Sequence, residues 1–171
     1  MSVDTRWLST EQLAAWVRLI GVLELLPATL DSQLRRDAQL THFDYFVLAT
    51  LSEAPEHTLR MTALAERTTA TLARLSHVVQ RLEGRGLLER FPCPTDRRAT
   101  NARLTDAGWQ KVQDSAPGHV AAVRATVIDA LTPEQITQLA AITDAILHRL
   151  DPDGSRTAIH QKYDSPPTDA R

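Results

Sequence analysis

The spacing of apolar residues predicts a chain built mainly of helices. Apolar positions recur every three or four residues through 13–26, and Ser9 with Gln12 forms a capping box just before them. Proline has no backbone donor, so Pro27 should kink or break this helix. We therefore expect an interrupted helical arm that ends near Gln39.

Three helices are expected in the next part of the chain. One begins at Thr41 or His42 and stops at Pro55. A short helix capped by Thr62 is then joined by a tight turn to a helix over residues 72–83. Two short helices separated by a tight turn are typical of a helix-turn-helix.

Between residues 86 and 104 the apolar pattern changes from helical spacing to alternation. Two alternating runs are separated by the turn Pro92 to Arg98, which predicts a β-hairpin. Thr105 can cap the next helix, which Pro117 and Gly118 should interrupt. Thr132 then caps a final helix that extends to residue 150.

The order of these elements predicts a mainly α fold: a winged helix-turn-helix with a two-stranded β-wing and N- and C-terminal dimerisation helices. The terminal helices are apolar around more than one face, so they need a partner surface, and a two-fold homodimer would supply it. We expect four segments: an N-terminal dimerisation region 8–40, a DNA-binding domain 41–108, C-terminal dimerisation helices 109–150 and a disordered tail 151–171.

Composition narrows the class of protein. Of 171 residues, 43% are hydrophobic and 23% charged, as in globular proteins. Charged residues interrupt the apolar runs, so we expect no membrane span, and the N-terminus lacks the features of a signal peptide. One cysteine, Cys93, permits no internal disulfide. These features favour a cytoplasmic protein.

Charge is unevenly distributed along the chain. Residues 60–105 hold nine Arg against four acidic residues, a balance of +5, although the whole chain carries −2. The remaining residues therefore sum to −7. Surface helices often carry scattered arginines, so an ordinary solvated face is the alternative to a binding surface.

The helix over residues 72–83 is the predicted DNA-reading helix. One face is apolar, with Leu72, Leu75, Val78, Val79 and Leu82. The other side has hydrogen-bond donors and no carboxylate, as a helix in a DNA major groove requires. The DNA-binding candidates on and before this helix are Thr71, Arg74, Ser76, His77, Gln80 and Arg81.

The hairpin tip supplies the remaining DNA-binding candidates. Arg97 and Arg98 could enter a minor groove, where narrow geometry concentrates negative potential. Asp96 is interpreted as a brace whose carboxylate fixes the turn and pairs with an arginine. The tip therefore predicts a wing that contacts double-stranded DNA.

The run from Leu64 to Gly108, with "RLEGRGLLER" and "DRRATNARLTDAG", resembles the DNA-binding core of the MarR family of bacterial regulators. The resemblance covers about residues 8–150. It implies an obligate homodimer, formed by the N- and C-terminal helices, that binds a pseudopalindrome and is often released by a small ligand or oxidant. We expect a repressor in preference to an activator. Asp96 and Arg98 would be the matching wing pair, whereas His77 stands where such proteins frequently carry Arg.

Cysteine and histidine are the remaining residue types that could form a reactive or metal site. Cys93 could sense oxidants, but we favour an exposed strand residue beside two prolines. The histidines lack metal-ligand spacing, and Glu24 with His42 is the best of several poor metal pairs. We predict no metal and no cofactor.

The meeting point of the first two helices borders the ligand cleft in the MarR family, which this chain resembles. The residues expected near it are Trp16, His42, Asp44 and Tyr45. This mixture could accept a small phenolic or anionic effector, or Trp16 and Tyr45 could be core residues.

An enzyme and a protein-binding adaptor are the two other classes of function. No nucleophile elbow, phosphate loop, zinc-protease motif or dinucleotide fingerprint is present, so we predict no enzyme and no catalytic residues. The alternative is a protein-binding winged-helix adaptor without sequence-specific DNA recognition. Sequence discrimination separates the two, because only base contacts distinguish one duplex from another.

Overall fold

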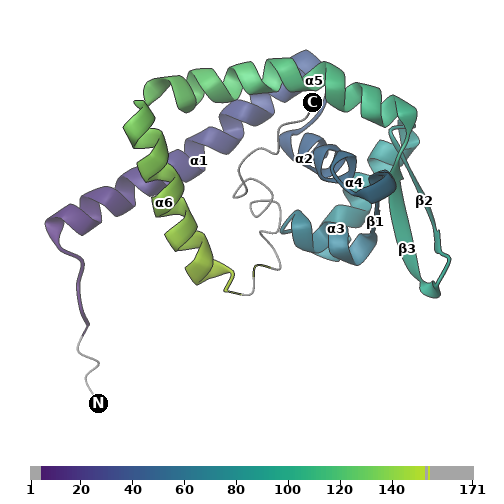
Figure 1. The fold of residues 1–171 in the computed structure, drawn as a ribbon, viewed down its shortest axis with the longest axis horizontal. Coiled ribbons are helices and arrows are strands. Elements are labelled where there is room, and N and C mark those ends of the chain that lie inside the picture. The colour runs from purple at the N-terminus through teal and green to yellow at the C-terminus, as the bar shows by residue number, and fades with distance from the viewer. Residues whose placement is uncertain (1–4, 153, 155–171) are drawn as a thin grey trace, which may run out of the picture.

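The computed structural model describes residues 5–152 and 154 of the chain. Two long helices, α1 and α5, pack side by side, and a smaller unit with the three-stranded sheet lies at one end of the molecule (Figure 1). The helices are α1 (Thr10–Ala38), α2 (His42–Ser52), α3 (Met61–Arg67), α4 (Leu72–Gly84), α5 (Asp106–Thr126) and α6 (Pro133–Leu150). Short 3-10 helices cover Pro55–His57 and Ile128–Ala130. The predicted mainly α, winged helix-turn-helix fold is confirmed.

The wing belongs to a sheet of three antiparallel strands. The strands are β1 (Thr58–Arg60), β2 (Leu88–Cys93) and β3 (Asp96–Leu104), in the spatial order β1-β3-β2. The predicted hairpin corresponds to β2 and β3, with a register shift between Pro92 and Cys93. Sequence reasoning missed β1, because three residues are too few to show alternation.

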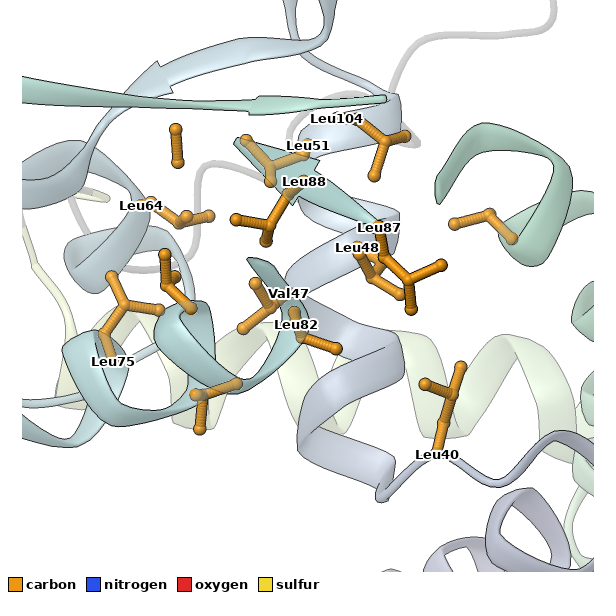
Figure 2. Close-up of a cluster of buried hydrophobic side chains, with 14 of the residues drawn as sticks. Leu40, Val47, Leu48, Leu51, Leu64, Leu75, Leu82, Leu87, Leu88 and Leu104 are labelled. Carbon is orange, nitrogen blue, oxygen red and sulfur yellow. The ribbon is translucent and has the colours of Figure 1, made fainter. Parts of the chain in front are cut away.

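The main core lies inside the winged-helix unit. Leucine and valine side chains from α2, α3, α4 and the sheet meet there, and the last turns of α1 close it (Figure 2). The largest fully buried side chains are Leu34, Leu40, Leu48, Leu51, Leu64, Leu75, Leu82 and Leu88. This core fixes α4 and the sheet relative to each other, so it positions the predicted DNA contacts.

Capping residues set most helix starts as expected. Ser9, Thr41 and Thr132 each form a complete capping box, and the Thr105 hydroxyl accepts a bond from the Gly108 N–H. Thr62 was expected to cap α3, and this is wrong. The helix already begins at Met61, because β1 leads directly into it without a capping side chain.

Neither internal proline interrupts its helix, contrary to expectation. Both α1 through Pro27 and α5 through Pro117 and Gly118 are continuous. A proline costs its helix one backbone hydrogen bond, but α5 packs against both α1 and α2. These tertiary contacts favour continuous helices where local preference alone would favour a break.

Large apolar surfaces remain exposed on α1 and α6. None of the residues of α6 is buried, and the buried residues of α1 all lie after residue 29. Exposed apolar side chains include Leu13, Trp16, Val17, Val22, Leu23 and Leu25 on α1 and Leu139, Ile142, Ile146 and Leu150 on α6. By length and composition alone, α1 could even cross a membrane, so the expectation that charges exclude such a segment is wrong.

The predicted tail begins at Asp151, which is the C-cap residue of α6. Asp151 is buried, and its N–H donates to the carbonyl of Leu147 at the end of α6. The remainder of the predicted tail, apart from residues 152 and 154, lies outside the described residues.

Candidate nucleic-acid interface

Helices α3 and α4 form the helix-turn-helix. Thr69, between them, has a left-handed backbone with φ 50°, which reverses the chain within a few residues. Thr71 is the N-cap of α4, and its hydroxyl accepts a hydrogen bond from the Arg74 N–H at 3.2 Å. Thr71, a predicted DNA contact, therefore also starts the reading helix.

The two faces of α4 largely match the sequence pattern. Leu75, Val78, Val79 and Leu82 are buried, while His77 and Gln80 are exposed on the opposite side. Leu72 was expected in the apolar face but is 47% exposed, because it lies in the first turn beyond the edge of the core. Glu83 lies near the end of the helix and is paired with Arg90.

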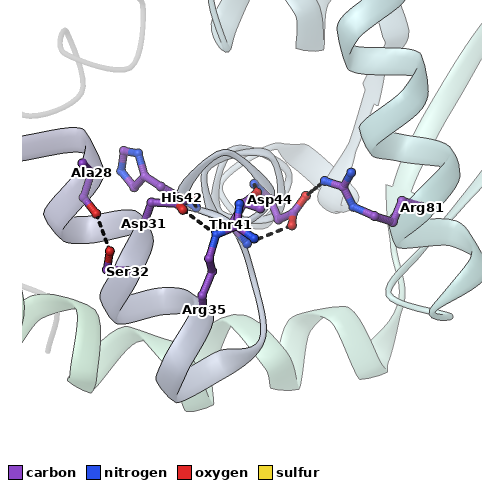
Figure 3. A network of polar contacts seen from close by, with 8 residues as sticks. All are labelled: Ala28, Asp31, Ser32, Arg35, Thr41, His42, Asp44 and Arg81. Atoms are coloured by element: carbon purple, nitrogen blue, oxygen red, sulfur yellow. Dashed lines mark hydrogen bonds and ion pairs between the residues drawn. The ribbon is translucent and has the colours of Figure 1, made fainter. Parts of the chain in front are cut away.

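Arg81 and Asp44 were predicted for two different sites, but the structure joins them in one ion pair. The Asp44 side chain is only 3% exposed and binds the half-exposed guanidinium of Arg81 (Figure 3). The same carboxylate accepts the Thr41 N–H at 2.9 Å. A buried carboxylate needs such partners, so Asp44 is not a free ligand-binding group.

A second carboxylate links α1 to the start of α2. Asp31 accepts the His42 N–H at 2.8 Å and pairs with Arg35 at 2.5 Å. These contacts, with that of Arg35 first in importance, hold the pKa of Asp31 below its ordinary value. Together with the bond from Arg85 Nη1 to the Gln39 carbonyl at 3.0 Å, they fasten the end of α1 to α2 and α4.

A third arginine contact involves an aromatic ring. The guanidinium carbon of Arg74 lies 4.2 Å from the ring centre of Phe43, in the first turn of α2. This distance is within the range of cation–π attraction. Arg74 therefore has a defined direction before any DNA is present.

The wing tip has the expected brace. Asp96 Oδ1 accepts the Arg98 N–H at 3.1 Å, and Asp96 Oδ2 lies 3.9 Å from Arg60 Nη1. Arg60, at the end of β1, also donates to the Thr95 hydroxyl at 3.4 Å. Arg98 is exposed, and Arg97 lies in β3, although its side chain is outside the described part of the structure.

A basic groove separates α4 from the wing. Ser76 lies on one wall, and Arg60, Arg90 and Arg98 contribute to the lining. Arg90 also joins the two walls, since its Nε and Nη2 bind Glu83 at 2.9 and 2.6 Å. That pairing lowers the pKa of Glu83, so the glutamate remains charged and bound to its partner.

Cys93 is not the exposed strand residue that the sequence indicated. Its side chain is only 5% exposed, because the irregular register before the turn directs it toward Thr95, whose hydroxyl lies 3.3 Å from Sγ. Hydrogen bonds with Thr95 lower the pKa of the thiol.

The four predicted ligand contacts do not form one cluster. His42 and Tyr45 lie together with His119 of α5, with ring centres 5.9 and 4.7 Å from that of His119. Trp16 precedes Asp31 by fifteen positions along the unbroken α1, which is about 22 Å at a rise of 1.5 Å per residue. Asp44 is occupied by Arg81, so only His42 and Tyr45 remain associated.

No group of three or more metal-binding side chains comes together within the described ranges. The sequence suggested Glu24 with His42 as a metal pair, but the two residues are far apart. His42 lies beside Asp31, whose carboxylate binds its backbone, and Glu24 lies two turns before Asp31 on α1.

Sequence reasoning missed Phe43, Arg60 and Arg85 as participants in this surface. Phe43 is an apolar residue in the first turn of α2, and an apolar residue carries no sequence signal for a contact with arginine. Arg60 and Arg85 lay outside the predicted reading face and wing tip. The excess of arginine between residues 60 and 105 was the available signal, because it marked the whole segment as basic.

Comparison with known proteins decides the family. Residues 40–100 match the model of the MarR family. The HTH-type transcriptional repressor MdtR of Bacillus subtilis (strain 168) is 30% identical over 114 residues, which cover 67% of this chain and 72% of MdtR. The chain belongs to the MarR family.

Solved structures of MarR family regulators agree with this assignment. Sco3205 of Streptomyces coelicolor, determined in complex with DNA, is 43% identical, with a TM-score of 0.84 over 89% of this chain and 95% of its own. AbsC of the same organism is 38% identical, with a TM-score of 0.82 over 87% of this chain and 100% of its own. This protein is therefore a MarR family transcriptional regulator, and that family consists of regulators, not enzymes.

Proposed function

We propose that this MarR family regulator is a cytoplasmic homodimeric repressor that binds a pseudopalindromic operator. The observation that carries the proposal is the exposed side of α4, which presents donors and no unpaired carboxylate beside a wing tipped with arginine. Such a surface suits a DNA groove, where an unpaired carboxylate would be repelled by phosphate.

The proposed DNA contacts divide between the two grooves. Ser76, His77 and Gln80 would face base edges in the major groove, and Arg74 would reach a base from the first turn of α4. Thr71 and Arg81 would contact the backbone. Arg97 and Arg98 would enter the adjacent minor groove, with Asp96 holding the turn.

The homodimer is supported by the apolar side chains that a single chain leaves uncovered on α1 and α6. A second copy would cover them across a two-fold axis and would present two α4 helices about one duplex turn apart, near 34 Å. Burial in such an interface, without a membrane, accounts for the apolar character of α1.

Two relatives support the finer parts of the proposal. Sco3205 was determined bound to DNA, which supports DNA as the partner of this chain. MdtR is named a repressor, which supports repression over activation. A small-molecule effector remains a prediction of the sequence, and its proposed contacts reduce to His42 and Tyr45 beside His119.

Selection of bound sequences from a random duplex library tests this function. A repressor of this kind should enrich one inverted repeat, and the enriched duplex should bind at least about a thousandfold more tightly than unrelated DNA. Recovery of DNA without a shared sequence would contradict the proposal. It would instead favour the winged-helix adaptor, whose basic surface would serve an acidic protein.

A further inference from the structure

Two arginines of α4 and the arginine that follows its last residue form one row along the side of the helix. Arg74, Arg81 and Arg85 are separated by seven and four positions, and helical geometry places such residues on the same face. We call these three side chains the arginine row. The arginine row lies next to the exposed side of the helix that carries His77 and Gln80.

Each member of the arginine row is held by the junction between α1 and α2. Arg74 lies over the Phe43 ring at 4.2 Å, Arg81 binds the buried Asp44, and Arg85 donates to the Gln39 carbonyl at 3.0 Å. The three contacts use three different chemistries. A single junction of six residues, 39 to 44 in the chain, therefore orients one side of the reading helix.

The contact with Phe43 leaves its arginine most available for DNA. The guanidinium of Arg74 lies against an aromatic face, which takes up none of its five N–H donors. Arg81, in contrast, gives donors to Asp44. Arg74 also lies in the first turn of α4, the part of a recognition helix that meets base edges.

We propose that Phe43 is a positioning residue for operator recognition, because its ring sets the direction of the Arg74 guanidinium for a base edge. This inference depends on the proposed DNA-binding function. A bidentate contact with a base demands a defined guanidinium plane, and a ring that fixes this plane beforehand reduces the ordering that binding would otherwise require. Phe43 itself does not touch DNA.

A double-mutant cycle tests the inference. The quantity measured is the ratio of affinities for the selected operator and for an unrelated duplex. Phe43→Leu, which keeps an apolar side chain without the aromatic face, should lower this ratio about tenfold. In an Arg74→Ala background the same substitution should cause no further loss.

Conservative variants separate positioning from packing. Phe43→Tyr keeps the ring and should retain the ratio, whereas Arg74→Lys loses the planar group and should lower it about as much as Phe43→Leu does. Phe46→Leu, on the same helix and also half-buried, is the matched control and should leave the ratio unchanged. Thermal unfolding of each variant checks that it folds, and Phe43→Met, which also lacks the aromatic face, replaces Phe43→Leu in the cycle should that variant not fold.

The outcomes distinguish the two proposals. If wild-type protein prefers its operator but Phe43→Leu keeps the full ratio, or lowers it equally without Arg74, the positioning role is wrong and the regulator function stands. If wild-type protein discriminates no sequence, both proposals are wrong.

Discussion

At the scale of single residues, Gly108 shows what a sequence pattern can and cannot reveal. The glycine was part of the family resemblance, but the pattern did not say what it approaches. A methyl group at this position would lie 1.9 Å from the carbonyl oxygen of Leu87 and 2.8 Å from Leu104 Cδ1. The start of α5 thus packs directly against the backbone that leads into the wing.

Gly108→Ala should therefore destabilise the protein by about 3 kcal/mol, at the upper end for overpacking, because backbone cannot move aside as a side chain can. Gly84→Ala is the matched control. Its added methyl group meets nothing within 4 Å at the end of α4, so stability should be unchanged or slightly higher. Urea unfolding of both variants checks this, and equal midpoints would refute the close approach.

The same scale explains why the site was only partly predictable. Donors on α4 and arginines at the wing were predicted from composition and periodicity, and His77, Gln80 and Arg98 among them are exposed. The pairing of Arg81 with Asp44 was not predicted, because 37 residues separate them and no local signal reports a long-range ion pair. The stacking of Arg74 on Phe43 was missed for the same reason.

At the scale of elements, local chemistry predicted starts better than interruptions. A capping side chain acts on backbone groups only a few residues away, so Ser9, Thr105 and Thr132 could be recognised from the sequence. The effect of an internal proline depends on what the helix packs against. Pro27 and Pro117 lie in helices that contact each other, and both helices continue.

The junction of α1, α2 and α5 holds two half-buried histidines. Burial lowers the pKa of both His42 and His119 below the ordinary 6.5, and the charge of His42 lowers that of His119 further. Asp31 faces His42 and partly opposes the lowering of its pKa. The ring of His119 lies beside the rings of both His42 and Tyr45. His119 also meets Gln33 at 3.4 Å.

These shifts predict that the protein loses stability in acid. Below pH 6.5 the unfolded chain binds protons at both histidines while the folded chain resists them, so the free energy of unfolding falls as pH falls through this window. The melting temperature should drop by several degrees between pH 7.5 and about 5.5, and His119→Gln should reduce that drop. His148→Gln, on the exposed surface of α6, serves as control, and an identical pH profile for all three proteins would exclude the junction as the cause.

In the whole molecule, the exposed apolar faces of α1 and α6 lie apart from the basic reading surface, so both surfaces can bind a partner at once. The apolar helices lie away from the sheet and α4, which occupy one end of the molecule (Figure 1). A partner on the apolar helices would leave the reading surface of each copy open. Apolar periodicity and the distribution of charge together predicted this separation, because the most apolar helices flank the most basic segment.

In the proposed homodimer, two copies present two α4 helices to the same side of one duplex. The dependence of affinity on half-site spacing measures this arrangement. With the selected inverted repeat, half-sites about 10 base pairs apart should bind most tightly, and an insertion of five base pairs should reduce affinity to that of a single half-site, because it rotates the second site to the opposite face of the DNA. Equal affinity for the repeat, the five-base-pair insertion and an isolated half-site would show that the protein does not bind DNA as a two-fold dimer.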